Sequence, residues 1–381
     1  MKIRTITIGF PYQKNMKYDD FIRMANILKE IKKRYQQEHY DVQTIRMSTQ
    51  PFMLYAKTKP EILSEVRRLA QLMHEKGIDY FNIGPTDQMD HIVWIPEILS
   101  SSSIVFCTAH ICNQQTIFYN HIKKVSEIIK KNALIEPQGF TNLRFASLCN
   151  IKPCTPFYPA SYHHQSPPSF GIGLENSDLV YQVFKNNRSF EDAQVQLRRI
   201  FLETYRPIES IAEKVSKEYN IGYDGIDTSI STSVHKQESI AYAYEHLLKG
   251  YRFGHPATLM ISKIITDTIR QLPIKKTGYC GLMLPVLEDY GLSVRNMEGC
   301  FSITDLLLYS SVCGTGLDTI PLPGDCTLKE IQHILLDVAT LSIKLQKPLS
   351  ARLMPIPGKK VGDMTEFSFP YFRNSTIMDP R

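Results

Sequence analysis

A carboxylate followed by hydroxyl side chains stands at a point of the sequence where α/β proteins build functional sites. Asp227 ends a strand-like run and precedes Thr228 and Ser229. Residues at the carboxyl ends of strands face the crevice in which ligands bind. The same pattern is also an ordinary signal for the start of a helix, so that alternative stays open. Asp227 is a candidate catalytic acid or base.

A run rich in glycine, proline and aspartate extends from residue 313 to residue 325. Glycine lets a ligand approach the backbone closely, and proline stiffens a turn. The run therefore predicts a ligand-facing loop in which Gly314 and Gly316 contact the substrate and Asp318 is a catalytic acid or base. A tight connection between a strand and a helix requires the same residue types, which leaves a purely structural role open.

An arginine follows a short strand-like run near the C-terminus. The planar donors of Arg352 suit a carboxylate or a phosphate, and Lys359 follows in a proline-rich loop. Both are candidate substrate-binding residues. A buried ion pair that holds the last strand in place is the alternative for Arg352, and the binding role requires the arginine to face a cavity rather than a neighbouring carboxylate.

Three further carboxylates are candidate metal ligands. Glu238, Asp325 and Asp363 offer the oxygen donors that hard divalent cations such as Mg²⁺ or Ca²⁺ prefer. Their positions are far apart along the chain, so the site requires the fold to bring them together.

An irregular segment at about 150–173 is rich in Pro, Ser, Tyr and His. Long loops of this kind inside a domain are usually functional or linkers. His163 is a candidate acid or base, and Tyr162 offers a face on which a substrate can stack. A pair of histidines in a polar loop is more often simply solvated, and that alternative stays open.

Strand and helix patterns alternate along the rest of the chain. Period-two or short apolar runs predict strands at 3–9, 41–47, 80–83, 103–107, 142–148, 223–228 and 279–284. Helical spacing and capping signals predict helices near 21–31, 58–77, 86–99, 114–131, 191–219, 237–248 and 327–348, and others that begin after residues 256 and 302. This alternation predicts a single α/β domain over 1–381 with a mostly parallel sheet, open or closed into a barrel.

Composition narrows the class of protein. The 381 residues carry 44 Lys+Arg against 38 Asp+Glu, too thin an excess to indicate a nucleic-acid partner. No apolar run approaches the ~18 residues of a membrane span, and the start of the chain lacks the apolar stretch of a signal peptide. Eight cysteines in this length favour reduced thiols. We therefore expect a cytoplasmic protein without a nucleic-acid or membrane partner.

Several common catalytic motifs are absent from the sequence. There is no phosphate-binding P-loop, no dinucleotide fingerprint, no His-Glu-x-x-His helix, no Gly-x-Ser-x-Gly elbow and no Cys-x-x-Cys pair. The reaction classes that depend on these motifs receive no support from the sequence.

Several long motifs, in order along the chain, resemble the domain-of-unknown-function family 711. They are Lys2-Ile-Arg-Thr-Ile-Thr, Asn142-Leu-Arg-Phe-Ala, Thr155-Pro-Phe-Tyr-Pro-Ala-Ser-Tyr162, Gly225-Ile-Asp-Thr-Ser, Gly314-x-Gly-Leu-Asp-Thr-Ile-Pro-Leu-Pro-Gly-Asp325 and Lys347-Pro-Leu-x-x-Arg-Leu-x-Pro-x-Pro-Gly-Lys-Lys-x-Gly-Asp363. The resemblance implies an α/β barrel like that of pyruvate formate-lyase, a homo-oligomer and an ACT-domain regulatory partner. Glycyl-radical chemistry is not implied, because the C-terminal segment lacks the radical-loop pattern and no adjacent Cys-Cys pair exists.

These residues together predict an enzyme of unknown reaction that acts on a small anionic metabolite, bearing a carboxylate or a phosphate, in a barrel cavity. A divalent cation is a possible cofactor. The alternative is a non-catalytic sensor or regulatory protein that binds an amino-acid-like metabolite. Both readings require the charged ends of stretches near residues 227, 318 and 352 to meet in one hollow.

Overall fold

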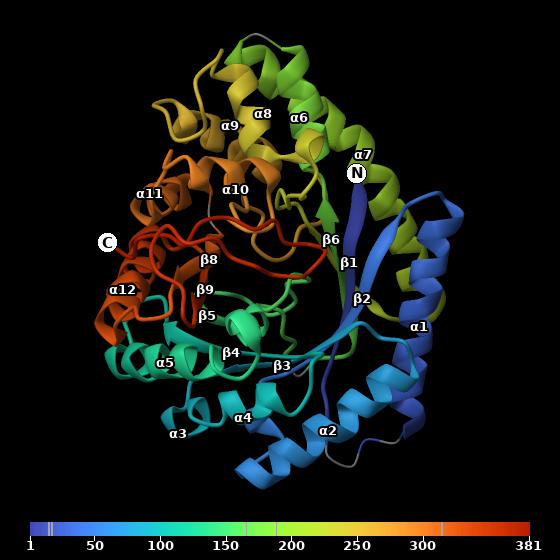
Figure 1. The fold of residues 1–381 in the computed structure, drawn as a ribbon. Coiled ribbons are helices and arrows are strands. Elements are labelled where there is room, and N and C mark those ends of the chain that lie inside the picture. The colour runs from blue at the N-terminus through green and yellow to red at the C-terminus, as the bar shows by residue number, and fades with distance from the viewer. Residues whose placement is uncertain (14–15, 17, 165, 188, 314) are drawn as a thin grey trace.

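A computed structural model describes residues 1–13, 16, 18–164, 166–187, 189–313 and 315–381. In this part of the chain, nine strands form one strongly curved sheet in the order β7-β6-β1-β2-β3-β4-β5-β9-β8 (Figure 1). The strands are β1 (Lys2–Phe10), β2 (Val42–Thr49), β3 (Tyr80–Thr86), β4 (Val105–Cys112), β5 (Phe145–Cys149), β6 (Ser169–Glu175), β7 (Gly222–Asp227), β8 (Gly316–Pro323) and β9 (Leu349–Ile356).

The sheet is mostly parallel, as the alternation of elements predicts. Strands β1 to β5 run parallel to one another. The pairs β6/β7 and β8/β9 are also parallel, but each joins the central strands through an antiparallel neighbour, β6 beside β1 and β9 beside β5. The chain thus has a mixed α/β fold.

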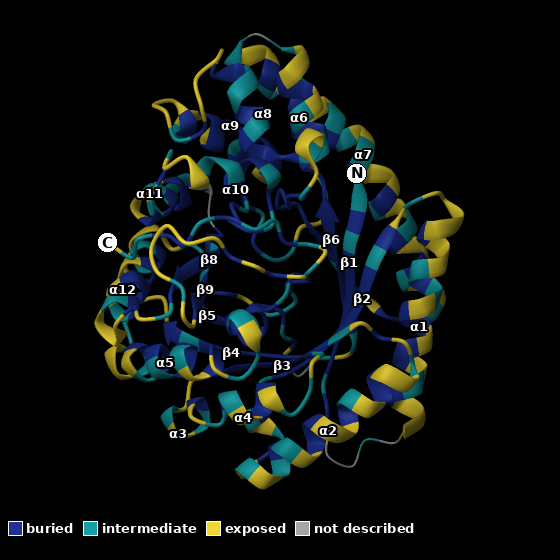
Figure 2. Ribbon diagram, viewed as in Figure 1, coloured by how far each residue is buried: buried dark blue, intermediate teal, exposed yellow. Residues whose placement is uncertain are grey.

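Helices cover the outer face of the sheet, and their exposed residues face away from it (Figures 1 and 2). For example, α1 packs on β1 and β2, α5 and α12 pack on β4 and β9, and α7 packs on β7. The described helices are α1 (Tyr18–Gln37), α2 (Lys59–Glu75), α3 (Met89–Ile92), α4 (Ile95–Ser100), α5 (Tyr119–Asn132), α6 (Ser177–Asn186), α7 (Phe190–Tyr219), α8 (Ile240–Leu247), α9 (Thr258–Arg270), α10 (Tyr290–Met297), α11 (Ile303–Cys313) and α12 (Leu328–Leu345). None of these helices is long and apolar enough to cross a membrane.

Capping residues fix where two predicted helices begin. The Thr58 side chain accepts a hydrogen bond from the Glu61 backbone at the start of α2. At the start of α12, Thr327 and Glu330 cap each other's backbone reciprocally. Both contacts satisfy N–H groups that have no partner within the helix.

Segment 275–286 lies between the two outermost strands. On one side, Ile226 donates to the Lys275 carbonyl and Ile230 to the Gly281 carbonyl. On the other side, Val286 donates to the carbonyl of Asp318 in β8. The strand predicted at 279–284 is thus wrong: the segment makes isolated bridges to both sheet edges instead of a continuous ladder.

The run from 313 to 325 is mainly strand β8, and not the predicted loop. Proline is tolerated in this strand because β8 lies at the edge of the sheet, where one side of the backbone needs no ladder partner. Gly314 lies outside the described residues. The β8/β9 register shifts between Leu317 and Ile320, and Thr319 has a positive φ of 46°. This irregularity sits directly at Asp318.

Two other predictions of element bounds were also wrong. The single helix predicted at 86–99 is two short helices, α3 and α4, because Pro96 lies in the first turn of α4 and cannot continue a preceding helix. The irregular loop ends at residue 168, since residues 169–175 form β6. Gly173 is untypical of a strand, so the sequence did not indicate β6 there. Glycine is required at this position because a Cβ would lie 2.8 Å from the Phe157 ring.

The C-terminal segment 357–381 crosses the open end of the curved sheet, where Figure 1 shows it in red. The Glu366 backbone donates to the Gln138 side chain at 3.1 Å, and the Arg373 backbone donates to the Leu287 carbonyl at 2.8 Å. Between these two attachments the segment places aromatic side chains against the hollow inside the sheet.

Gly316 provides a test of the close approach between β8 and β9. Its φ is 95°, and a Cβ would collide with the backbone of Ser350. Gly316→Ala should lower the free energy of unfolding by about 2 to 3 kcal/mol in urea titrations. Gly358→Ala is the matched control, because its φ is also positive at 80° but nothing lies within 4 Å, so about 1 kcal/mol is expected. Equal losses in the two variants would contradict this packing.

Candidate functional site

The inner face of the sheet encloses a cavity of about 100 Å³, measured as the space open to the centres of water-sized spheres. Its lining draws on β1, β2, β3, β4, β5, β8 and β9, together with loop residues and the C-terminal segment. The charged lining residues are Arg4, Arg46, Arg352, Glu288 and Asp318, and the aromatic ones are Tyr80, Phe106, Phe157, Tyr158, Tyr279, Phe369 and Tyr371. The cavity thus combines charged groups with aromatic walls.

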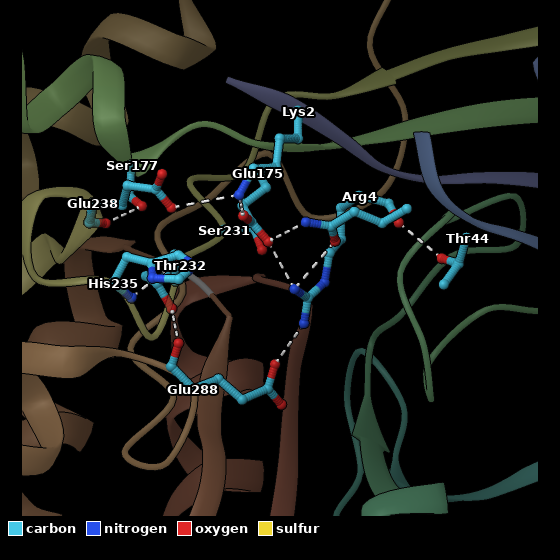
Figure 3. A network of polar contacts seen from close by, with 12 residues as sticks. Lys2, Arg4, Thr44, Glu175, Ser177, Ser231, Thr232, His235, Glu238 and Glu288 are labelled. Atoms are coloured by element: carbon cyan, nitrogen blue, oxygen red, sulfur yellow. Dashed lines mark hydrogen bonds and ion pairs between the residues drawn. The ribbon is translucent and has the colours of Figure 1, made fainter. Parts of the chain in front are cut away.

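Two of the three arginines are held by a shared glutamate. Glu288 accepts from Arg4 Nη2 at 3.0 Å through Oε2 and from Arg352 Nη2 at 2.7 Å through Oε1. Arg4 also pairs with Glu175 at 2.7 Å (Figure 3). These contacts connect β1, β6 and β9 through a residue that precedes α10, so the ion pairs fasten opposite sides of the cavity wall.

Asp318 completes this chain of charges. Its Oδ1 accepts from Arg352 Nε at 2.6 Å, and its side chain remains 24% exposed toward the cavity. Burial alone would lower the pKa of Arg352, but the attraction of Asp318 and Glu288 raises it above its ordinary value. Arg352 is therefore a permanent cation whose charge is largely offset, as the ion-pair alternative predicted, although it also lines a cavity.

Arg46 differs from the other two arginines. It is only 8% exposed, and among the described residues no carboxylate lies within ion-pair distance. Its Nε donates to Thr44 Oγ1 at 3.0 Å, and its guanidinium carbon lies 5.4 Å from the Tyr80 ring and 5.0 Å from the Tyr158 ring. Burial, followed by repulsion from Arg4, lowers the pKa of Arg46 to about 10, which leaves it charged at neutral pH.

Asp227 does not line this cavity. It is fully buried and accepts from the backbones of Tyr279 at 2.8 Å and Cys280 at 3.0 Å, and from the backbone and hydroxyl of Ser229. Burial raises the pKa of Asp227, while these hydrogen bonds act in the opposite direction. The carboxylate thus holds segment 275–286 against β7, and through Tyr279 it positions a side chain that does line the cavity. Four residues after Asp227, Ser231 does line the cavity.

His163 and Tyr162 also lie outside the lining. His163 is 1% exposed, with its Nδ1 3.7 Å from Cys154 Sγ and its Nε2 3.3 Å from the Ser166 carbonyl. Burial lowers the pKa of His163 to about 4, so its ring is neutral at pH 7. Tyr162 donates to the Ile151 carbonyl at 2.9 Å. The loop instead contributes Phe157, Tyr158 and Pro159 to the cavity.

Among the other predicted substrate-binding residues, Lys359 and Gly316 take part in contacts that hold the fold together. Lys359 pairs with Glu366 at 2.8 Å on the C-terminal segment. Gly316 permits close packing of β8 on β9, and Gly314 lies outside the described residues. Of the predicted binding residues that the structure describes, Arg352 alone lines the cavity.

The three predicted metal ligands are not brought together. Glu238 lies 3.7 Å from Lys2 Nζ, Asp325 is exposed beside α12, and Asp363 accepts from the Lys360 backbone at 2.7 Å in an exposed turn. Within the described residues, no three His, Cys, Asp or Glu side chains lie close enough to share a metal ion.

Sequence reasoning missed Arg4, Arg46 and Glu288. Arg4 and Arg46 interrupt runs of apolar and hydroxyl residues in two strands, and an isolated arginine in a buried strand is the signal that could have indicated them. Glu288 has no comparable signal, because it lies in a segment without regular structure.

A family model described as Uncharacterised ACR (DUF711) matches residues 1–368. The chain belongs to this family. A UPF0210 protein of Clostridium perfringens is 24% identical over 402 residues, covering 96% of this chain and 88% of that protein. A UPF0210 protein of Neisseria meningitidis is 25% identical over 397 residues, with 96% and 87% covered. One from Pyrobaculum aerophilum is 30% identical over 231 residues, with 58% and 51% covered. The recognised resemblance is thus confirmed.

Methionine substitutions should separate the unpaired arginine from a paired one. Arg46→Met removes a buried charge without an acidic partner and should raise the free energy of unfolding of the ligand-free protein by about 1 to 2 kcal/mol. Arg352→Met leaves Asp318 and Glu288 each short of a cation and should lower it by about 3 to 5 kcal/mol. Urea unfolding measures both, and similar destabilisation by the two changes would contradict the difference in pairing.

His163 should make stability depend on pH. Its folded pKa of about 4 lies below the unfolded value of about 6.5, so the unfolded chain binds the proton more readily and stability is lost as the pH falls between these values. From about pH 7 to about pH 4.5, wild type should lose about 2 kcal/mol more than His163→Gln in urea titrations. The exposed neighbour supplies the control, since His164→Gln should keep the wild-type loss. An unchanged pH dependence in His163→Gln would refute the assignment.

Proposed function

We propose that this protein is an enzyme that acts on a small anionic metabolite bound in the cavity inside the curved sheet. The observation that carries the proposal is Arg46, a buried guanidinium at the cavity wall without an acidic partner among the described residues. A buried charge without compensation is strongly unfavourable. A bound anion would supply the missing compensation.

The neighbouring arginines place further N–H donors at the same cavity. Arg4 and Arg352 both line it, although Glu175, Glu288 and Asp318 offset their two positive charges. An arrangement of fixed charges in a water-poor cavity interacts more strongly with a ligand than the same charges would in water. Binding is therefore centred on Arg46, the arginine whose charge no described carboxylate offsets.

Asp318 is the favoured acid/base group of the proposed reaction. Only Oδ1 of its carboxylate is engaged by Arg352, and no described group donates to Oδ2. Because Oδ2 of Asp318 has no donor among the described residues, Asp318 suits the role of a base that takes a proton from the bound anion. Glu288 is less suited, since both of its oxygens accept from arginines.

The proposal assigns no chemical step to Asp227, His163 or the predicted metal ligands. Asp227 acts as a positioning residue through Tyr279, and His163 lies behind the strand residue Gly9. Glu238, Asp325 and Asp363 lie outside the cavity lining.

The proposed architecture is a single domain in which the sheet closes into a barrel resembling that of pyruvate formate-lyase. Support comes from segment 275–286, which bridges β7 and β8 and so fills the gap between the sheet edges. A homo-oligomer, an ACT-domain partner and a cytoplasmic location stay predictions.

A non-catalytic sensor of an amino-acid-like metabolite is the second candidate. It is favoured by the pairing of Glu288 and Asp318 with arginines and by the lack of His, Cys or Lys in the described lining. A sensor needs satisfied polar contacts, whereas an enzyme also needs a titratable group within reach of the reacting atom.

Incubation of the native protein with a cellular metabolite extract, followed by mass spectrometry, tests both candidates. Wild type should retain an anion and convert it over time. Arg46→Gln should neither retain nor convert it, and Asp318→Asn should retain it but convert it at least ~100-fold more slowly. Arg34→Gln, at an exposed pair with Glu218, should match wild type.

The outcomes distinguish the enzyme from the sensor. An anion that is retained by wild type but never converted would support the sensor and exclude the enzyme. Retention of every anion by Arg46→Gln at the wild-type level would refute the binding site itself. Urea unfolding of each variant shows whether a loss reflects binding or folding.

A further inference from the structure

We infer that the cavity ligand is a monocarboxylate with a planar, apolar body of roughly the size of benzoate. This inference rests on the proposed function and names the chemical class of its ligand. Three properties of the cavity carry it: the balance of charges, the geometry around Arg46 and the composition of the walls.

The balance of charges favours a single negative charge. Three arginines and two carboxylates line the cavity, which leaves one positive charge. Glu175 lies outside the lining but reduces the charge of Arg4 further. A dianion would therefore meet only one uncompensated guanidinium, together with the repulsion of Glu288 and Asp318. Burial of a second charge without a partner is unfavourable.

The geometry around Arg46 favours a carboxylate. Its Nε is already committed to Thr44, and Tyr80 and Tyr158 both lie within stacking range of the guanidinium. No hydrogen bond from either Nη to a described residue competes with a ligand. Two parallel N–H groups of this kind match the two oxygens of a planar carboxylate. Thr44 and the two tyrosine rings thus hold the guanidinium in place rather than leaving it free to rotate.

Features typical of phosphate sites are missing from the described lining. It contains no lysine and no glycine, and no helix begins at the cavity wall with its free N–H groups as lining. Phosphate sites commonly use such backbone groups and lysines. A carboxylate needs only the guanidinium fork.

The walls favour an apolar planar body. Phe106, Phe157 and Phe369 face the cavity from β4, the irregular loop and the C-terminal segment. The space of about 100 Å³ that is open to the centres of water-sized spheres leaves room for a small aromatic ring.

Binding of four probes to the full-length protein tests the inference by calorimetry and by thermal unfolding. Benzoate has the predicted charge and shape, benzamide lacks the charge, phthalate carries a second carboxylate, and inorganic phosphate is tetrahedral. Benzoate should bind at least ~10-fold more tightly than each of the other three and should raise the unfolding temperature.

Two variants of Arg46 separate the contribution of its positive charge from that of its paired N–H donors. Arg46→Lys keeps the positive charge but loses the paired donors and should weaken benzoate binding by ~10-fold or more. Arg46→Gln loses both and should weaken it by ~100-fold or more. Arg34→Lys is the surface control and should bind benzoate as wild type does.

The failure of this inference can be told apart from the failure of the proposed function. Tighter binding of phosphate or phthalate than of benzoate, abolished by Arg46→Gln, would refute the monocarboxylate class but keep the anion site. Equal binding of benzoate by wild type and Arg46→Lys would refute the claim that the paired N–H donors of Arg46 bind the carboxylate. Absence of binding by benzoate, phthalate and phosphate at millimolar concentrations would overturn the inferred ligand class, whereas the anion site itself is overturned if wild type retains no anion from the metabolite extract.

Discussion

The uncompensated charge of Arg46 is the constraint on which the proposed site depends. Folding removes this guanidinium from water and gives it one hydroxyl oxygen and two aromatic rings in return. Such contacts contribute less than a carboxylate would, because cation–π attraction is worth only about 1 to 2 kcal/mol. A group of this kind is more easily understood as part of a binding site than as a contribution to stability.

The other charged groups of the cavity set the field in which Arg46 acts. Glu288 holds Arg4 and Arg352 on opposite sides of the hollow, and Asp318 is directed inward by the irregular register between β8 and β9. Bulges of this type commonly redirect a side chain near a functional site. Asp227 influences the cavity indirectly, because it anchors the segment that carries Tyr279. Segments of irregular backbone therefore position Glu288, Asp318 and Tyr279, while the regular strands supply the three arginines.

The order of elements could be predicted from sequence because most of them carry a clear period or cap, as α2 and α12 show. Strand β8 could not, since its prolines and glycines are typical of a loop unless the strand is known to be at an edge. The sequence predicted that the stretches around Asp318 and Arg352 meet in one hollow, but it did not predict that the two side chains pair directly. Arg46 was not predicted, because a period-two pattern shows that a strand has two faces without showing which one borders a cavity.

A high-resolution crystal structure of the protein, purified without added ligand and then soaked with benzoate, tests the central claim most directly. The carboxylate should lie within hydrogen-bond distance of both Nη atoms of Arg46, with its ring among the aromatic walls. A structure in which Arg46 pairs with a carboxylate of the protein, or in which the cavity is closed by side chains, would contradict it.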